Sequence, residues 1–425
     1  MKRTIRDWFQ LLGGLVLPLL LLLTACDRGA PSTEELEEIA AALLPRLEVL
    51  SGLEAREPIR LAWQSRAEMQ EFVERQLDEE LPPEYLDEMK GAYTAFGLLP
   101  DTLDLRALLL ELYSEQVVGY YDPAAETLYI VEGTPTSDIE TVLVHELVHA
   151  LQDQHANLDS LIARERGNDA QTAAQAALEG QATLVMFALL IERQLGREID
   201  PAQIPPIGDQ MQSLLDAQNS QFPVFQNAPR LIRETLLFPY IGGASFVQTL
   251  WEYEGRRDPD DPGPHFTAPL GEFMPQSTEQ VLYPLERFLE YRDPPIGIEI
   301  EGGPTGAKTL LENDLGAFEI GILLDEHLGA DTRTRVRGWA GDRYRYIELE
   351  DGRTALIWYT LWDDDVSADS FADAYRQILE RRPERRGKIT RTEIEGEPAV
   401  IIIDTEASLD PEMIEAPPVR RLVRE

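Results

Sequence analysis

The sequence predicts an α+β fold made of a mainly helical part and a small mixed part. Over residues 34–302, apolar residues recur mostly at helical spacing, and two β-rich runs around a turn indicate a small edge sheet. From about Gly303, two β-rich runs, an amphipathic helix and two more β-rich runs follow one another. We therefore expect a helical domain with a small edge sheet over 34–302 and a β-β-α-β-β domain over 303–425.

Residues 1–25 are predicted to be a targeting segment rather than part of the fold. Lys2, Arg3 and Arg6 precede an uncharged apolar run that is interrupted by Pro18 and ends at Cys26, the only cysteine. A run of this length suits the core of a signal peptide better than a membrane-spanning helix.

The residues "LTAC" that end this run resemble a bacterial lipobox. The resemblance implies cleavage before Cys26, lipidation of its thiol, and a short tether over 26–33. The alternative is a retained membrane anchor with a free cysteine. Both readings place the remaining chain on the extracytoplasmic face of the cell membrane, and a single cysteine leaves no disulfide to staple the fold.

The chain is strongly acidic. Its 77 Asp and Glu residues against 38 Lys and Arg give a formal net charge of -39, spread along the whole sequence. Such a surface repels nucleic acids and anionic lipid headgroups, so we expect no nucleic-acid partner. High solubility is the simplest consequence of this charge.

The elements of the helical part are expected in a definite order. Ser137 and Glu140 have the spacing of a capping box, which predicts that a helix begins near Asp138. A later long helix is expected to be interrupted near Pro239. The expected helices of this part cover 34–49, 66–77, 83–99, 138–155, 170–193 and 230–251, with a strand at 58–63 and a hairpin at 117–131. The expected C-terminal strands cover 335–349, 354–362, 388–395 and 399–405, with a helix at 367–382.

The segment "TVLVHELVHALQDQH" holds three of the five histidines of the chain. On a helix, His145 and His149 lie about 40° apart and one turn from each other, so both imidazoles can reach one ion. Glu146 lies beside them, in the H-E-x-x-H pattern in which two histidines bind zinc and the glutamate is a general base. The alternative is two histidines with satisfied hydrogen bonds on a packed helix.

A catalytic zinc ion usually takes three protein ligands, and two residues compete for the third place. His155 has the third-ligand spacing of the metzincins, but Gln152 stands where that family has a chain-turning glycine. If the helix continues, His155 points away from the other two histidines, so we expect a polar residue near the helix end.

Glu179 is the better candidate for the third ligand. It is the only charged residue between Asp169 and Glu192 on a largely apolar helix, and a buried carboxylate needs a partner such as a divalent metal ion. The adjacent Gly180 removes a side chain where another helix backbone could approach closely. The alternative is a solvated glutamate on an exposed stripe of the helix.

These motifs resemble a known group of enzymes. The H-E-x-x-H segment with a downstream "ALEGQAT" resembles the gluzincin metallopeptidases, whose third zinc ligand is a glutamate on a later helix. The segments "GYYDP", "LEGQAT", "FPYIGGASFV", "STEQVLYP" and "GWAGDRY" also resemble a largely uncharacterised family of bacterial secreted or lipid-anchored metallopeptidases, over about Gly119 to Tyr344. One departure is Tyr283, where that family often has a histidine.

The resemblance implies a zincin-like fold for the helical domain and a Zn²⁺ ion held by His145, His149 and Glu179. Zinc lowers the pKa of a bound water to about 7, so Glu146 can take its proton as the water attacks a peptide carbonyl. Glu146 can then pass the proton to the leaving amine. The expected partner of the site is therefore a peptide or protein substrate.

Two further residues are candidates for supporting roles. Tyr240 could donate a hydrogen bond to the developing oxyanion from a glycine-rich bend, or it could be a core aromatic beside a proline kink. Thr183 lies one helical turn after Glu179 and could orient it. His265 and His327 are expected to be loop or surface residues.

The β-rich run before the histidine helix is a candidate for binding extended substrate. In gluzincin-like sites the strand before the zinc helix commonly pairs with the substrate, which makes Tyr129 and Val131 candidate substrate-binding residues. Tyr120, Tyr121 and Asp122 are expected to serve hairpin packing and the turn.

The leading hypothesis from the sequence is a membrane-anchored, extracytoplasmic zinc peptidase. The alternative is a non-catalytic binding or scaffold lipoprotein with a structural or degenerate metal site. The fourth coordination position separates the two, because a structural zinc site is closed by a fourth protein ligand.

Overall fold

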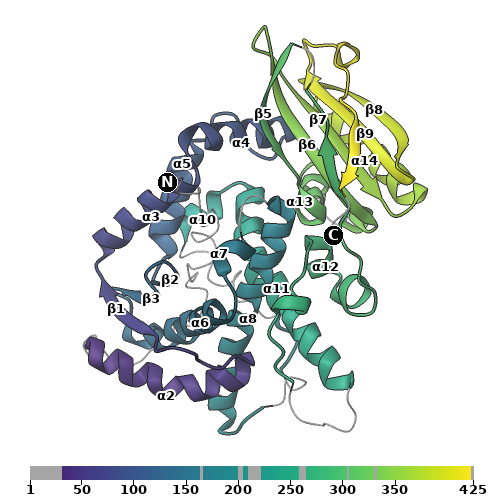
Figure 1. Ribbon diagram of the computed structural model, residues 1–425. Coiled ribbons are helices and arrows are strands. Elements are labelled where there is room, and N and C mark those ends of the chain that lie inside the picture. Colours follow the sequence, from purple (N-terminus) through teal and green to yellow (C-terminus); the bar gives the residue numbers. More distant parts are fainter. Residues whose placement is uncertain are drawn as a thin grey trace.

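The computed structural model describes residues 31–162, 166–199, 204–208, 222–257, 265–303, 306–329 and 333–422. It confirms an α+β protein with a small antiparallel sheet in the C-terminal part. Figure 1 shows the mainly helical part and, drawn in green to yellow, the C-terminal sheet. The predicted signal peptide over 1–25 and Cys26 lie outside the described residues.

The helical part contains one small sheet and a set of helices packed on a common core. Its helices are α2 (Thr33–Ser51), α3 (Arg66–Glu80), α4 (Pro83–Phe96), α5 (Leu105–Gln116), α6 (Thr136–His155), α7 (Leu158–Leu161), α8 (Asn168–Leu195), α10 (Pro223–Asn227), α11 (Arg230–Arg257) and α12 (Thr278–Leu282). Short 3-10 and π turns are η4 (Gly271–Phe273) and η5 (Leu285–Leu289).

The sheet of the helical part has three strands, β1 (Arg60–Gln64), β2 (Gly119–Asp122) and β3 (Thr127–Val131), in the order β1-β3-β2. β3 pairs in parallel with β1 and antiparallel with β2. Both edges of β3 are therefore occupied, and the expectation that Tyr129 and Val131 offer an exposed edge to substrate is wrong. The sequence could not reveal this, because β1 precedes the hairpin by about 60 residues.

α6 carries the H-E-x-x-H segment, but it begins differently from the prediction. The helix starts at Thr136 after Pro135, and no side chain caps its first turn. The predicted capping box is absent, because Ser137 lies inside the helix and its hydroxyl donates to Asp138 at 2.8 Å. Proline at the N-cap fixes the entry of the chain into the helix instead.

α8 and α11 cross at a close contact between two glycines. A Cβ atom on Gly180 would overlap the backbone of Gly243, and one on Gly243 would overlap the backbone of Ala176. The prediction that Gly180 allows close helix approach is therefore confirmed. α8 is apolar and long enough to span a membrane, yet most of it is buried inside the protein, so it is the central core helix.

α11 runs without a break through Pro239, so the predicted interruption is wrong. Proline removes one backbone hydrogen bond of the helix, which usually costs stability or introduces a kink. Packing against α8 along much of the helix keeps the residues on both sides helical. Tyr240 consequently projects from a continuous helix rather than from a glycine-rich bend.

The C-terminal part is built on a five-stranded antiparallel sheet in the order β5-β6-β7-β9-β8. The predicted β-β-α-β-β order is present as β6 (Trp339–Leu349), β7 (Thr354–Trp362), α14 (Asp365–Arg381), β8 (Arg385–Ile394) and β9 (Glu397–Glu406). Further elements are β4 (Gly297–Ile300), β5 (Ala307–Asn313), α13 (Gly316–Leu328), η6 (Arg333–Val336), η7 (Pro411–Met413) and β10 (Val419–Leu422).

The two parts are joined by shared packing. β4, which precedes Gly303, pairs with β10 near the end of the chain. One hydrophobic core continues from the helical part into α13, α14 and the inner face of the sheet. A second cluster covers the other face of the sheet, beneath β4 and β10.

We expect Gly180→Ala to destabilise the protein by about 1–3 kcal/mol, because the added methyl group would force α8 and α11 apart. This loss would outweigh the gain of about 1 kcal/mol in helix propensity. Chemical denaturation of the purified protein measures the effect. Gly303→Ala is the control, since a Cβ there meets nothing within 4 Å. Equal stability of Gly180→Ala and the wild type would refute the close helix contact.

Candidate metal centre

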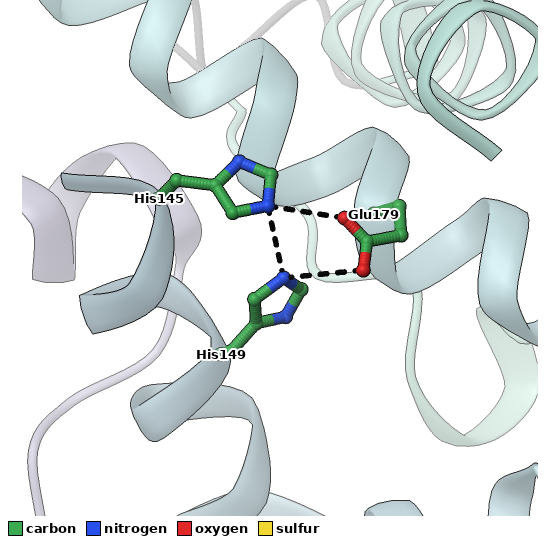
Figure 2. A group of neighbouring side chains, drawn as sticks. All are labelled: His145, His149 and Glu179. Carbon is green, nitrogen blue, oxygen red and sulfur yellow. Dashed lines mark hydrogen bonds and ion pairs between the residues drawn. The ribbon is translucent and has the colours of Figure 1, made fainter. Parts of the chain in front are cut away.

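Two helices bring two imidazoles and one carboxylate to a single buried point. His145 and His149 project from one face of α6, and Glu179 projects towards them from α8 (Figure 2). The Nε2 atoms of the two histidines lie 3.0 Å apart. The Glu179 carboxylate oxygens lie 3.0 Å from Nε2 of His145 and 3.4 Å from Nε2 of His149. All three side chains are almost fully excluded from solvent.

The spacing of these atoms fits a divalent metal ion. Zinc binds histidine nitrogen and carboxylate oxygen at about 2.0–2.2 Å in a tetrahedron, whose ligand atoms are then about 3.3 Å apart. The observed separations of 3.0 to 3.4 Å match that value. Two imidazole nitrogens and one carboxylate oxygen also form a donor set that zinc prefers. His145, His149 and Glu179 could therefore hold such an ion.

Gln152 fixes the orientation of the His149 ring and keeps a proton on its Nδ1 atom. Its side-chain nitrogen donates to the carbonyl of Leu178 at 3.0 Å and to Oε1 of Gln181 at 2.8 Å. Its oxygen therefore faces Nδ1 of His149, at 2.8 Å, and must accept a proton from it. Nε2 of His149 therefore faces the candidate metal position, and it would bind a metal ion after losing its own proton, in the orientation common among metal-binding histidines.

The same network reaches a third helix. Gln181 on α8 donates through its side-chain nitrogen to the carbonyl of Ser51, the last residue of α2, at 2.7 Å. Gln152, Gln181 and Ser51 are all buried. Buried polar groups of this kind rigidify a site when they are fully hydrogen-bonded. The position of His149 is thus coupled to the packing of α2, α6 and α8.

The electrostatics of the three candidate ligands favour positive charge between them. Burial would lower the pKa of His149, but the attraction of Glu179 outweighs it and raises the pKa to about 9. Burial lowers the pKa of His145 despite its hydrogen bond with Glu179. Burial would raise the pKa of Glu179, but the two histidines hold it below its usual value.

Glu146 is a fully buried carboxylate beside this group. Neither of its oxygens has a hydrogen-bond partner among the described residues. Burial raises its pKa to about 8, although His149 and the backbone N–H of Tyr121 act in the opposite direction. A buried acid without a partner is costly, so it points to a water molecule or ligand group that completes the site.

Tyr240 lies at the same site. Its ring centre is 6.2 Å from that of His145, and its side chain is buried. Burial and the nearby Glu179 and Glu146 carboxylates raise the pKa of Tyr240 well above its usual value, and a hydrogen bond to Glu179 contributes. The tyrosine is therefore a protonated donor that packs in the core and faces the carboxylates.

The predicted role of Thr183 is wrong. Its hydroxyl oxygen is buried and has no hydrogen-bond partner among the described residues, so it does not orient Glu179. The hydroxyl and the carboxylate lie one turn apart on α8, but backbone spacing alone does not bring their atoms together. Tyr240 interacts with the carboxylate instead.

The remaining histidines lie apart from the centre. His155 ends α6, and its ring nitrogen donates to the carbonyl of Glu54 at 2.7 Å, as expected of a polar residue at a helix end. His265 lies in a loop. The loop or surface assignment of His327 is wrong, because this residue is partly buried in the last turn of α13 and donates to the carbonyl of Phe96.

The aromatic residues of the hairpin serve packing, as expected. The ring of Tyr120 stacks on Tyr129 and Phe72. Tyr121 donates through its hydroxyl to Asp153, and Asp122 accepts from the backbone of the turn.

Sequence reasoning missed two features of this site, the Gln152 network and the position of β2. The three-residue spacing of His149 and Gln152 on one helix was a usable signal for the first. The second feature depends on tertiary pairing. β2 pairs only with β3 among the described strands, and the N–H of Tyr121 acts on Glu146, so the free edge of β2 borders the site.

We expect Gln152→Ala to lower the affinity of the protein for Zn²⁺ about ten- to a hundredfold, because His149 loses the partner that orients it. Competition with a chromophoric chelator measures this affinity. Gln154→Ala is the control, because this half-buried amide of α6 bonds to Arg56 and Glu57 and not to His149, and Thr183→Val tests the excluded role. An unchanged affinity in Gln152→Ala, or a loss as large in Thr183→Val, would contradict this account of the site.

The C-terminal part of the chain matches a domain family. A domain of unknown function, DUF8575, matches residues 306–408, which span β5 to β9. No curated protein and no solved structure matches the chain.

Proposed function

We propose that this protein is a zinc-dependent peptidase, anchored at the extracytoplasmic face of the cell membrane through Cys26, whose helical part has a zincin-like fold. The proposal is carried by one observation, the convergence of His145, His149 and Glu179 beside the unpartnered carboxylate of Glu146. The H-E-x-x-H segment and its resemblance to gluzincin peptidases support the same function.

In the proposed reaction His145, His149 and Glu179 hold the metal ion. When bound, zinc polarises a carbonyl group and lowers the pKa of water to about 7. Glu146 accepts the proton of the attacking water and later donates it to the leaving amine. The elevated pKa of Glu146 suits a group that must take up and release a proton near neutral pH.

Tyr240 acts in this proposal as the hydrogen-bond donor to the carbonyl oxygen as negative charge develops there. Its phenol is protonated at all physiological pH values, and it lies beside His145 and Glu179. A donor in a dry site stabilises such charge far more than it would in water.

The free edge of β2 is the proposed place for the substrate backbone. This edge replaces the occupied edges of β3, and it borders the site at Tyr121 and Glu146. Backbone pairing at a strand edge recognises extended peptides without regard to their side chains.

A scaffold lipoprotein is the competing function. A structural zinc site is closed by four protein ligands, and it has no use for an acid beside the metal. Within the described ranges, no fourth histidine, cysteine, aspartate or glutamate joins the group of His145, His149 and Glu179. The three-ligand group with Glu146 beside it favours hydrolysis.

We expect the purified protein to bind one Zn²⁺ ion and to cleave peptides. The Glu146→Gln variant should keep the metal ion but lose about 10²–10⁴-fold in kcat, because the proton acceptor is gone. Elemental analysis and a fluorogenic peptide library measure the two properties. Glu132→Gln, at an exposed site, is the matched control. Absence of bound metal, or equal hydrolysis by the wild type and Glu146→Gln, would overturn the proposal. If the metal is bound and hydrolysis is equal, the result would favour the scaffold lipoprotein.

We expect Tyr240→Phe to lower kcat about 10²–10³-fold, the usual effect of removing one oxyanion donor, with Zn²⁺ content and KM nearly unchanged. Steady-state kinetics on the best peptide measures this split. Tyr253→Phe, further along α11, is the control for loss of a phenol. Wild-type kcat in Tyr240→Phe would mean that the residue only packs in the core.

A further inference from the structure

A pocket lies near the candidate metal centre and is lined by residues of α3, α4, α5, α8, α11 and α13. Its volume is about 90 Å³, enough for several water molecules or one long side chain. Most of its wall is apolar and includes Leu105, Leu109, Leu231 and Leu236.

Two helices place the pocket one turn from the metal centre. On α8, Gln175 lines the pocket and Glu179 follows four residues later. On α11, Leu236 lines the pocket and Tyr240 follows four residues later. Residues four apart share a helix face and are separated by about one pitch of 5.4 Å. Tyr113 also lines the pocket and contributes to the raised pKa of Tyr240, so the two sites adjoin.

The far end of the pocket holds one carboxylate, that of Glu319 on α13. Glu319 interacts with Asn168, which lies eleven residues before Glu179 on α8 and therefore about 16 Å along the helix axis. Among the described residues that line the pocket, Glu319 is the only one with a charged side chain. This end of the pocket therefore offers a single carboxyl group, and no lysine or arginine among the described wall residues is paired with it.

The charge of Glu319 is poorly compensated. The hydroxyl of Tyr93 lies 2.9 and 3.1 Å from its two oxygens, whereas a carboxylate can accept about four hydrogen bonds. Burial raises its pKa to about 8, and Asp314 and Asp342 add to this effect against Asn168 and Tyr93. A cation that enters the pocket would supply the missing compensation.

We propose that this pocket binds a lysine or arginine side chain of the substrate residue beside the scissile bond, with Glu319 as its charge partner. This inference rests on the proposed peptidase function. The apolar walls suit the methylene stem of such a side chain, and the distant carboxylate suits its charged head. The levels of Gln175 and Asn168 lie about 10 Å apart along α8, a distance that only an extended lysine or arginine side chain together with its hydrogen bond to the carboxylate comes close to spanning.

Gln175 has a complementary role at the end of the pocket nearer Glu179. Its side-chain nitrogen is buried and has no hydrogen-bond partner among the described residues. A backbone carbonyl of the bound peptide would satisfy this donor while the basic side chain points inward. The pocket would then bind both the backbone and the side chain of one substrate residue.

The test is a peptide series that differs only at the residues on either side of the scissile bond, with lysine, arginine, norleucine or glutamate at each. We expect wild-type kcat/KM to be at least tenfold higher for lysine or arginine than for norleucine on one side. Glu319→Gln should abolish this advantage while norleucine peptides are still cleaved within about threefold of the wild type. Equal cleavage of lysine and norleucine peptides by the wild type would overturn the inference and leave the peptidase function standing.

A second variant and a binding probe keep the test decisive if Glu319→Gln folds poorly. Thr235→Leu narrows the pocket from α11 without touching the carboxylate, so it should slow cleavage of lysine and norleucine peptides alike. If no peptide is cleaved, the peptidase proposal fails, and calorimetry with n-butylguanidinium decides the pocket. If the wild type binds n-butylguanidinium but not n-butanol, the result supports a pocket for a cation. If n-butylguanidinium does not bind, the inference is overturned.

Discussion

The structure depends on the burial of one carboxylate, Glu179, against two imidazoles. A buried carboxylate is costly unless charge and hydrogen bonds compensate it, and α8 carries this one through the centre of the core. α6 must therefore place His145 and His149 level with Glu179 along α8. The glycine contact between α8 and α11 sets how closely Tyr240 approaches the same carboxylate. The arrangement of the helical part follows from these requirements.

Local sequence patterns predicted most of the long helices and the three candidate ligands, but they missed α5 and α13 and could not show the tertiary pairing of the strands. The two histidines share a face because of helical periodicity, and Glu179 stood out as a lone carboxylate on an apolar helix. The parallel pairing of β1 with β3 joins distant segments, so no local pattern could show that Tyr129 lies on a central strand. The direction of the Thr183 hydroxyl likewise depends on packing that the sequence does not display.

The C-terminal part packs against the helical part and contributes one residue to the pocket. It shares the hydrophobic core with the helical part, and β4 and β10 join its two ends. α13 belongs to this part and supplies Glu319 to the pocket that residues of α3, α4, α5, α8 and α11 also line. In the proposed enzyme, the helical part would supply the chemistry and the C-terminal part would supply one determinant of which substrate is cleaved. The segment that matches DUF8575 would then act in substrate selection.

X-ray absorption at the zinc edge would show directly whether two imidazoles and a carboxylate hold the metal, because it reports the atoms around the metal in solution. We expect the zinc ion to be surrounded by two imidazole nitrogens at about 2.0–2.1 Å and by oxygen ligands from one carboxylate and solvent. Glu179→Gln should alter this set of ligands, whereas Glu132→Gln should not. A protein without bound zinc, or a zinc shell that contains no imidazole, would contradict the account.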